Sequence, residues 1–159
     1  MMKKNILFIA LFSTLCGFAY SQHSDLIAKG INAEQLGLLD RAKGYYEQVA
    51  AAEPDNAEPL LMLGKLQEKR SHFSEAAVTL RQAVALNDTL AEAYEHLVYC
   101  YIENGDFDGS RSGHFNGVDD LQQLAERAIE LNPQSTSAYC SMALIYNYRK
   151  NYTNAINWV

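Results

Sequence analysis

The stretch ALNDTLAEAYEHL, residues 85–97, returns in altered form as ELNPQSTSAYCSM, residues 130–142, and more faintly as AAEPDNAEPLLML, residues 51–63. The faint copy precedes the first stretch by 34 residues, whereas the clear copy follows it by 45. A recurring period of about 20–50 residues is the signature of a repeat protein. This spacing therefore decides the fold.

The same kinds of residue recur in four successive units. Each unit opens with an apolar residue and carries a small one four positions later: Leu26 and Gly30, Leu60 and Gly64, Tyr94 and Val98, Tyr139 and Ala143. A short connection follows, at Gly37, Ser71, Gly105 and Lys150, and then an apolar residue at Leu39, Phe73, Phe107 and Tyr152. Apolar residues at intervals of three and four predict helices, and the small residues let a neighbouring helix approach closely.

This pattern, closed by Pro54, Asp88 and Pro133, resembles the tetratricopeptide repeat, a helix-turn-helix unit of 34 residues. The resemblance implies an all-α fold, a right-handed superhelical solenoid of antiparallel helix pairs with about three and a half units. We expect a repeat domain over residues 22–159. Its units are 23–56, 57–90, 91–135 and an incomplete 136–159.

An insertion explains the longer interval. The segment DGSRSGHFNGV, residues 108–118, follows Phe107, and removing these 11 residues restores the spacing from 45 to 34. The insertion is predicted to lie in the turn between the two helices of the third unit. Because inserted loops carry function more often than the scaffold beneath them, Arg111, His114 and Phe115 are candidate partner contacts.

The first 21 residues have the order of a secretory signal peptide: basic Lys3 and Lys4, an apolar stretch, and a small-residue cleavage site ending at Ser21. We expect an exported chain, periplasmic or extracellular, with no membrane insertion after cleavage. An uncleaved anchor and a lipoprotein acylated at Cys16 are the alternatives. The net charge of −6, made more negative by loss of the two lysines, disfavours nucleic acid as a partner.

No arrangement of residues in the sequence indicates catalysis. The four histidines have no metal-ligand spacing with one another or with a cysteine, and no nucleophile motif occurs. We therefore predict a chain that is not an enzyme and uses no cofactor or metal. Cys100 and Cys140 remain open between two interpretations, a pair of buried small hydrophobes or a disulfide.

The family resemblance also implies a binding groove, because the first helix of each unit lines the concave side of the superhelix. The positions that match the groove face are Ile27, Ile31 and Glu34; Glu58, Leu61, Met62, Lys65, Glu68 and Lys69; Glu92, Glu95, His96, Tyr99 and Glu103; and Cys140, Leu144, Asn147 and Tyr148. A solvated helix face without a ligand is the alternative interpretation.

The expected function is a non-catalytic scaffold that binds a peptide or protein segment in this groove. Some family members hold a carboxylate with Lys, Asn and Arg, but here Ile27 and Ile31 replace the first two and Glu92 with His96 replaces a basic pair. A ligand with basic and apolar side chains is favoured instead.

Two alternatives depend on the incomplete fourth unit. In the first alternative, the chain is the N-terminal repeat region of a longer, possibly enzymatic, envelope protein. In the second, it is a module that associates with itself. Both start from the expectation that one apolar face of this unit meets water, partly exposing Met142, Ile145, Tyr146, Trp158 and Val159.

Overall fold

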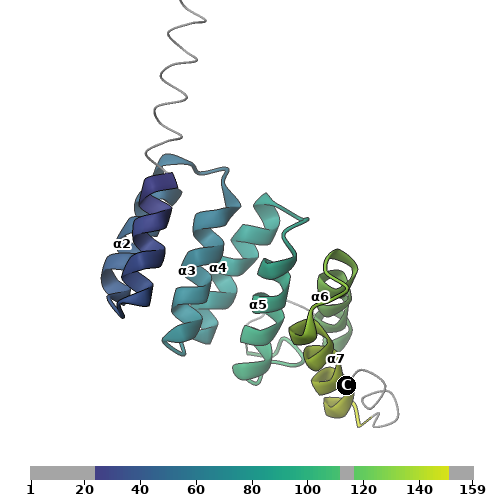
Figure 1. Ribbon diagram of the computed structural model, residues 1–159. Helices are drawn as coiled ribbons and strands as arrows, with labels where there is room; N and C mark the ends of the chain where they lie inside the picture. Colours follow the sequence, from purple (N-terminus) through teal and green to yellow (C-terminus); the bar gives the residue numbers. More distant parts are fainter. Residues whose placement is uncertain (1–23, 112–116, 151–159) are drawn as a thin grey trace, which may run out of the picture. The chain divides into compact units, whose positions relative to one another are not determined.

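The computed structural model describes residues 24–111 and 117–150, which form helices joined by turns, with no strand among them. A first helix over 24–35 precedes the six labelled in Figure 1: α2 (Leu39–Ala52), α3 (Ala57–Lys69), α4 (Phe73–Leu86), α5 (Ala91–Glu103), α6 (Val118–Leu131) and α7 (Thr136–Tyr148). The chain divides into two compact units, the first ending at Glu53 and the second beginning at Pro54. The predicted all-α class is confirmed.

In the first unit, the helix over 24–35 packs against α2 through Gly30 and Tyr46. A Cβ atom at Gly30 would lie 2.3 Å from Cε1 of Tyr46, so only glycine permits this approach. The buried Tyr46 hydroxyl donates a hydrogen bond to Oε1 of Glu34 at 2.7 Å. Burial, reinforced by that bond, raises the pKa of Tyr46.

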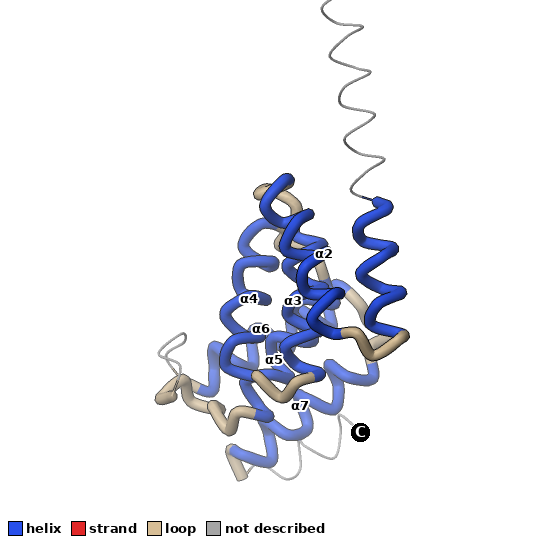
Figure 2. Tube along the Cα trace, turned by 90° about the vertical axis from the view of Figure 1, so that its left-hand side faces the viewer, coloured by secondary structure: helices blue, strands red, loops and turns tan. Residues whose placement is uncertain are grey.

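In the second unit, each helix packs on the next, from α3 through α7. The first helices also contact one another, α3 with α5 and α5 with α7, so they form one layer. Figure 2 shows α4 and α6 on the other side of this layer. This is the arrangement of stacked antiparallel pairs, in which each pair covers the apolar stripe of its neighbour.

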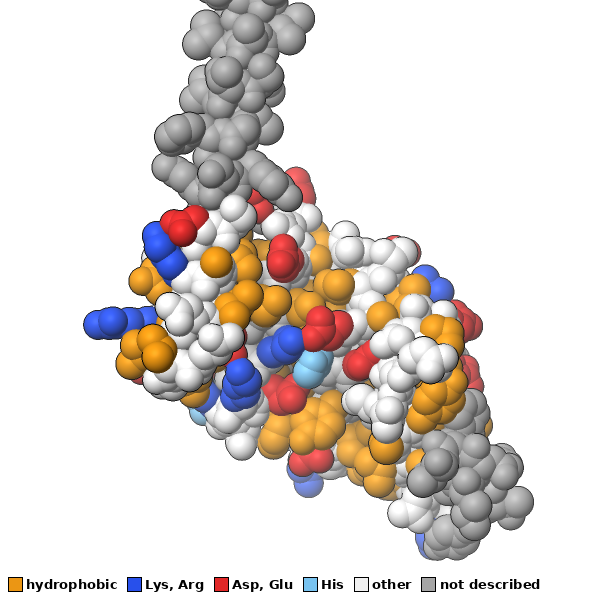
Figure 3. All heavy atoms as spheres, in the orientation of Figure 1, with side chains coloured by type: hydrophobic (Ala, Val, Ile, Leu, Met, Phe, Trp, Pro, Cys, Tyr) orange, Lys and Arg blue, Asp and Glu red, His pale blue; other side chains and the backbone are white. Residues whose placement is uncertain are grey.

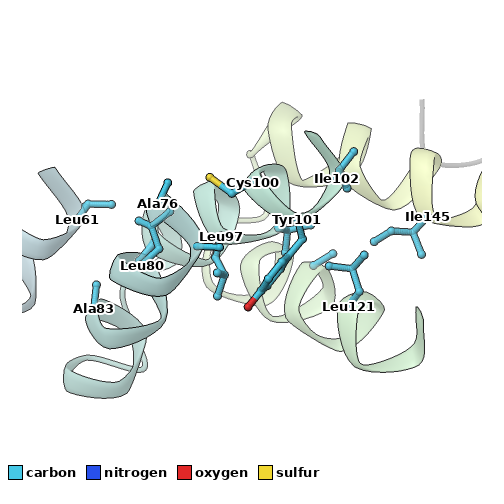
Figure 4. Packing of buried hydrophobic residues seen from close by; sticks show 14 of the residues in the cluster. Leu61, Ala76, Leu80, Ala83, Leu97, Cys100, Tyr101, Ile102, Leu121 and Ile145 are labelled. Carbon is cyan, nitrogen blue, oxygen red and sulfur yellow. The ribbon is translucent and has the colours of Figure 1, made fainter. Parts of the chain in front are cut away.

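The core of the second unit runs continuously through these pairs. Leu97 and Tyr101 of α5, each 1% exposed, lie between Leu80 of α4 and Leu121 of α6 (Figure 4). Burying one such side chain stabilises the fold by about 1.5–3 kcal/mol. The central helix α5 therefore holds the neighbouring pairs together.

The turns that end the first helices share one backbone conformation. Gly37, Ser71, Gly105 and Lys150, the connection residues of the four units, have φ angles of 72°, 61°, 66° and 57°. Beyond Ser71 the chain closes the helix with two hydrogen bonds, from Ser71 N to Glu68 O and from His72 N to Gln67 O. Such a left-handed residue ends a helix and satisfies its last carbonyls. The repeat spacing thus corresponds to a turn geometry that recurs in each unit.

The fourth unit differs from expectation at its apolar residues. Met142 and Ile145 were predicted to be partly exposed, and this prediction was wrong: both are fully buried in the core cluster. They face α5 and α6, which pack on α7 from the preceding unit. Tyr146 is half-buried against the same cluster, and Trp158 and Val159 lie outside the described residues.

No helix within 24–111 or 117–150 is long and apolar enough to cross a bilayer. The predicted signal peptide, residues 1–21, lies outside the described residues. The insertion ends slightly earlier than predicted, because Val118, its expected last residue, is the first residue of α6.

Candidate functional site

A charged network joins α3 and α5 on the layer of first helices. Lys65 of α3 pairs with Glu92 of α5, and His96 Nδ1 of α5 lies 2.6 Å from Glu68 Oε2 of α3. The other ring nitrogen of His96 is 3.8 Å from Glu92 Oε1, which connects the two pairs. In Figure 3, a histidine lies on this face among acidic and basic side chains, next to a group of hydrophobic ones. The network thus links the side chains of the two helices.

A cavity of about 570 Å³ lies at the N-terminal ends of α3 and α5, beside this network. Its apolar lining comes from α3, from the end of α4 and from the turn before α5: Leu61, Met62, Leu86 and Leu90. Carboxylates stand at Asp55, Glu58 and Glu92. Four residues predicted for the groove, Glu58, Leu61, Met62 and Glu92, therefore line one cavity.

Aromatic side chains lie toward the C-terminal ends of α5 and α7. The ring of Tyr99 meets Phe73 edge to face, with centroids 6.2 Å apart, and Tyr148 stacks on Phe107 at 4.5 Å with an interplanar angle of 5°. Burial, and then the carboxylates of Glu103 and Glu68, raise the pKa of Tyr99. Both predicted groove tyrosines thus pack against an aromatic residue of a connecting turn or a helix start.

The α7 side of the predicted face is apolar and exposed. Leu144 is 45% and Tyr148 49% exposed, and Cys140 and Asn147 also meet solvent. Between α5 and α7, Glu95 Oε1 accepts a hydrogen bond from Asn132 Nδ2 at 3.1 Å. This bond ties the groove face to the turn that ends α6.

Comparisons with known proteins identify the family of this chain. A family model described as "Tetratricopeptide repeat" matches residues 27–77 and 61–122, more than half of the chain. The chain belongs to the tetratricopeptide repeat family. Human tetratricopeptide repeat protein 7A is 33% identical over 81 residues, which cover 51% of this chain but only 9% of that protein.

Two solved structures show the same fold. The crystal structure of MamA matches with a TM-score of 0.71 and 21% identity, covering 92% of this chain and 80% of that one. The first repeat domain of Spaghetti (RPAP3), bound to the HSP90 peptide SRMEEVD, matches with a TM-score of 0.70 and 20% identity. That match covers 82% of this chain and 94% of the Spaghetti domain.

Within this tetratricopeptide repeat chain, not all predicted groove residues face solvent. Leu61 was expected on the groove face, but it is 3% exposed and belongs to the core cluster, reaching only the floor of the cavity. The face of α3 is narrower than the family pattern implies because α4 covers its flank. Ile27 and Ile31 belong to the first unit, where Ile27 is half-buried and Ile31 is 40% exposed. Lys69 and Glu103 are exposed on their helices.

The start of the insertion is an ordered turn. The carboxylate of Asp106, fully buried, accepts a hydrogen bond from the backbone N–H of Arg111 at 3.0 Å. The Arg111 guanidinium donates to the carbonyl oxygen of Asn104 at 2.6 Å, so this predicted contact residue folds back on its own loop. His114 and Phe115 lie outside the described residues.

The two cysteines of the repeat domain differ in environment. Cys100 is buried and Cys140 exposed, and both are free thiols. The expectation that both are buried hydrophobes therefore holds for Cys100 and fails for Cys140, which lies on the exposed face of α7. Within 24–111 and 117–150, no three His, Cys, Asp or Glu side chains gather as a metal site.

Several site residues were missed by the sequence reasoning. Asp55 and Leu90 line the cavity from the turns between helices, Leu86 lines it from the end of α4, and Asn132 binds Glu95 from another turn. The groove map considered first helices alone. The closing turns of the repeat, already visible at Pro54 and Asp88, were the signal that could have located these residues.

Proposed function

We propose that this chain is a protein-interaction scaffold that binds a segment rich in basic and apolar side chains along α3 and α5. The observation that carries the proposal is the cavity at the N-terminal ends of these helices, with its apolar floor and carboxylate rim. Protein–protein interaction is the general role of the family. The choice of face and of ligand chemistry is the proposal.

The cavity fits a long side chain with a cationic end. An aliphatic stem would contact Met62 and Leu90, while an ammonium or guanidinium group would reach Glu58 or Asp55 at the rim. Lysine and arginine bury their stems in this way and keep the charge near solvent. Hydrogen bonds to charged groups contribute about 1.5–3 kcal/mol, less where water screens them.

The charge of the whole face supports the same ligand. Acidic residues outnumber basic ones, at Glu58, Glu68, Glu92, Glu95 and Glu103 against Lys65 and Lys69. The Spaghetti domain binds a peptide with an acidic end. The present face would repel such a peptide, because like charges across an interface cost affinity and lower the association rate.

A peptide display selection tests the proposal. The purified chain is exposed to a random peptide library, and the bound peptides are compared with those selected by Glu58→Gln and by a control, Glu75→Gln, whose carboxylate lies on the exposed surface of α4. We expect Lys, Arg and apolar residues to be enriched by the parent and the control, with weaker Lys and Arg enrichment for Glu58→Gln. Enrichment of acidic peptides, or selection of the same peptides by all three proteins, would refute the proposed ligand chemistry.

Self-association is a second candidate, favoured by the exposed Leu144 and Tyr148 on α7. It predicts that sedimentation velocity shows a dimer whose proportion rises with concentration and falls for Leu144→Glu. A role as the repeat region of a longer protein is the remaining alternative, and an in-frame continuation of the gene would establish it.

Export completes the proposed role. The basic, apolar and small-residue segments before Ser21 support secretion and cleavage after that residue. N-terminal sequencing of the protein from its native cells should then begin at Gln22. A mature protein that begins at Met1 or Met2 would contradict the proposal.

A further inference from the structure

A second cavity, of about 560 Å³, opens between the second helices α4 and α6 and has α5 as its floor. These are the helices on the far side of the first-helix layer in Figure 2, so the cavity is separate from the groove described above. Its volume falls within the range of small-molecule sites, about 300–1,000 Å³. None of the residues predicted for the groove lines this second cavity.

The floor of this cavity and part of its walls are apolar. Leu97 and Tyr101 of α5, each 1% exposed, form the floor with Tyr94, and Val84 and Leu124 contribute from α4 and α6. Such a lining suits an aromatic or branched aliphatic group, because water is released from both surfaces on contact.

Two arginines from different helices stand at the cavity. Arg81 comes from α4 and Arg127 from α6, and the only acid among the lining residues is Asp120. The cavity is thus a locally basic place in a chain whose net charge is −6. A guanidinium group presents parallel N–H donors that match the two oxygens of a carboxylate.

The present partners of Arg127 can be exchanged for such a ligand. One terminal nitrogen of Arg127 lies 3.1 Å from Glu130, one turn along the same helix and 65% exposed, and the other donates to the carbonyl oxygen of Asp88 over a longer 3.4 Å. Exposed pairs of this spacing contribute little to stability and are readily exchanged for another carboxylate. Burial raises the pKa of Tyr101 and nearby Arg81 offsets part of that rise, which places the guanidinium beside the floor hydroxyl.

We propose that this cavity binds an organic carboxylate with an apolar body, held by Arg81 and Arg127 over the floor of α5. The ligand bridges α4 and α6, which belong to successive repeats, and so stabilises their arrangement. The carboxylate belongs either to a free small acid or to an acidic side chain beside an apolar residue in another protein. Both sources share this recognition chemistry.

The test uses NMR titration of the isotopically labelled full chain with 3-phenylpropionate and with its neutral amide. We expect saturable shifts of Leu97 and Tyr101 amides with the acid, at least about tenfold weaker binding of the amide, and a similar loss for Arg81→Gln and Arg127→Gln. Asp120→Asn should bind more tightly, because it removes the carboxylate that repels the ligand. Arg41→Gln, exposed on α2, is the matched control and should bind like the parent.

All the substituted side chains are exposed or half-buried, so far-UV circular dichroism should be unchanged in each variant. A capped dipeptide, acetyl-Phe-Asp-amide, distinguishes the two sources: tighter binding of the dipeptide assigns the site to a protein side chain, and tighter binding of the free acid to a small molecule. The proposal is overturned by equal binding of acid and amide, by equal weakening in Arg41→Gln, or by the absence of saturable shifts with both the free acid and the dipeptide.

Discussion

Gly64 of α3 offers the sharpest test of the packing within a repeat. A Cβ atom added there would lie 2.5 Å from Cγ and 2.6 Å from Cδ2 of Leu80, which is fully buried in α4. Carbon atoms in contact normally stand about 3.5–4.0 Å apart. Gly64→Ala therefore forces Leu80 or the helix itself to move.

The magnitude follows from two opposing effects. Alanine in a helix interior is more favourable than glycine by about 0.5–1 kcal/mol, whereas overpacking a dense core costs about 1–3 kcal/mol. We expect Gly64→Ala to lower the free energy of unfolding by about 1 kcal/mol. Gly44→Ala in α2 is the matched control, because nothing lies within 4 Å of its added Cβ, and it should raise that free energy by about 0.5–1 kcal/mol.

Urea unfolding of the three proteins, followed by far-UV circular dichroism, measures both effects. The midpoints should move in opposite directions, with Gly64→Ala below the parent and Gly44→Ala above it. Leu80→Val should recover part of the loss in the Gly64→Ala background, since it removes a methylene where the contact is closest. A Gly64→Ala protein as stable as Gly44→Ala would refute this account of helix packing.

Three further predictions concern a turn, a buried thiol and an aromatic pair. Ser71→Gly should raise the free energy of unfolding in urea by up to about 1 kcal/mol, because glycine adopts the 61° φ angle without strain; a lower free energy of unfolding contradicts this. Burial, aided by Glu68 and Glu103, raises the pKa of Cys100 from 9.0 to about 12. The contribution of the protonated Cys100 thiol to stability is therefore complete below pH 9 and is lost as the pH rises toward 12. Between pH 9 and 11, Cys100→Ala should thus lose less stability than the parent. Equal losses of stability in the two proteins contradict this. A double-mutant cycle on the stacked Phe107 and Tyr148 should give a coupling of about 0.5–1.5 kcal/mol, and zero coupling would show that the stack is incidental.

The helices were predictable from the sequence because each unit repeats the same local signals. Small residues such as Gly64 mark close approach, and Ser71 and Gly105 mark the left-handed turn that ends a first helix. These features depend on residues close in sequence, so the spacing alone locates them. The same register predicted one face for Glu58, Met62 and Glu92, and all three line one cavity.

Side-chain partners were less predictable, because they depend on residues far apart in the chain. The link between His96 and Glu68 spans α5 and α3, and that between Asn132 and Glu95 joins the beginning and the end of the third unit. Burial of Met142 and Ile145 was missed for a related reason. The repeat pattern led us to expect an exposed face on the fourth unit and did not indicate that α5 and α6 cover these residues.

The most direct test of the central claim, that the α3–α5 face binds a basic and apolar segment, is NMR mapping of a peptide that the display selection enriches. The account predicts that the amides of Glu58, Met62 and Glu92 shift most, and that Glu58→Gln weakens binding while Glu75→Gln does not. The largest shifts on α4 and α6, with binding unaffected by Glu58→Gln, would contradict it and move recognition to the other side of the repeat.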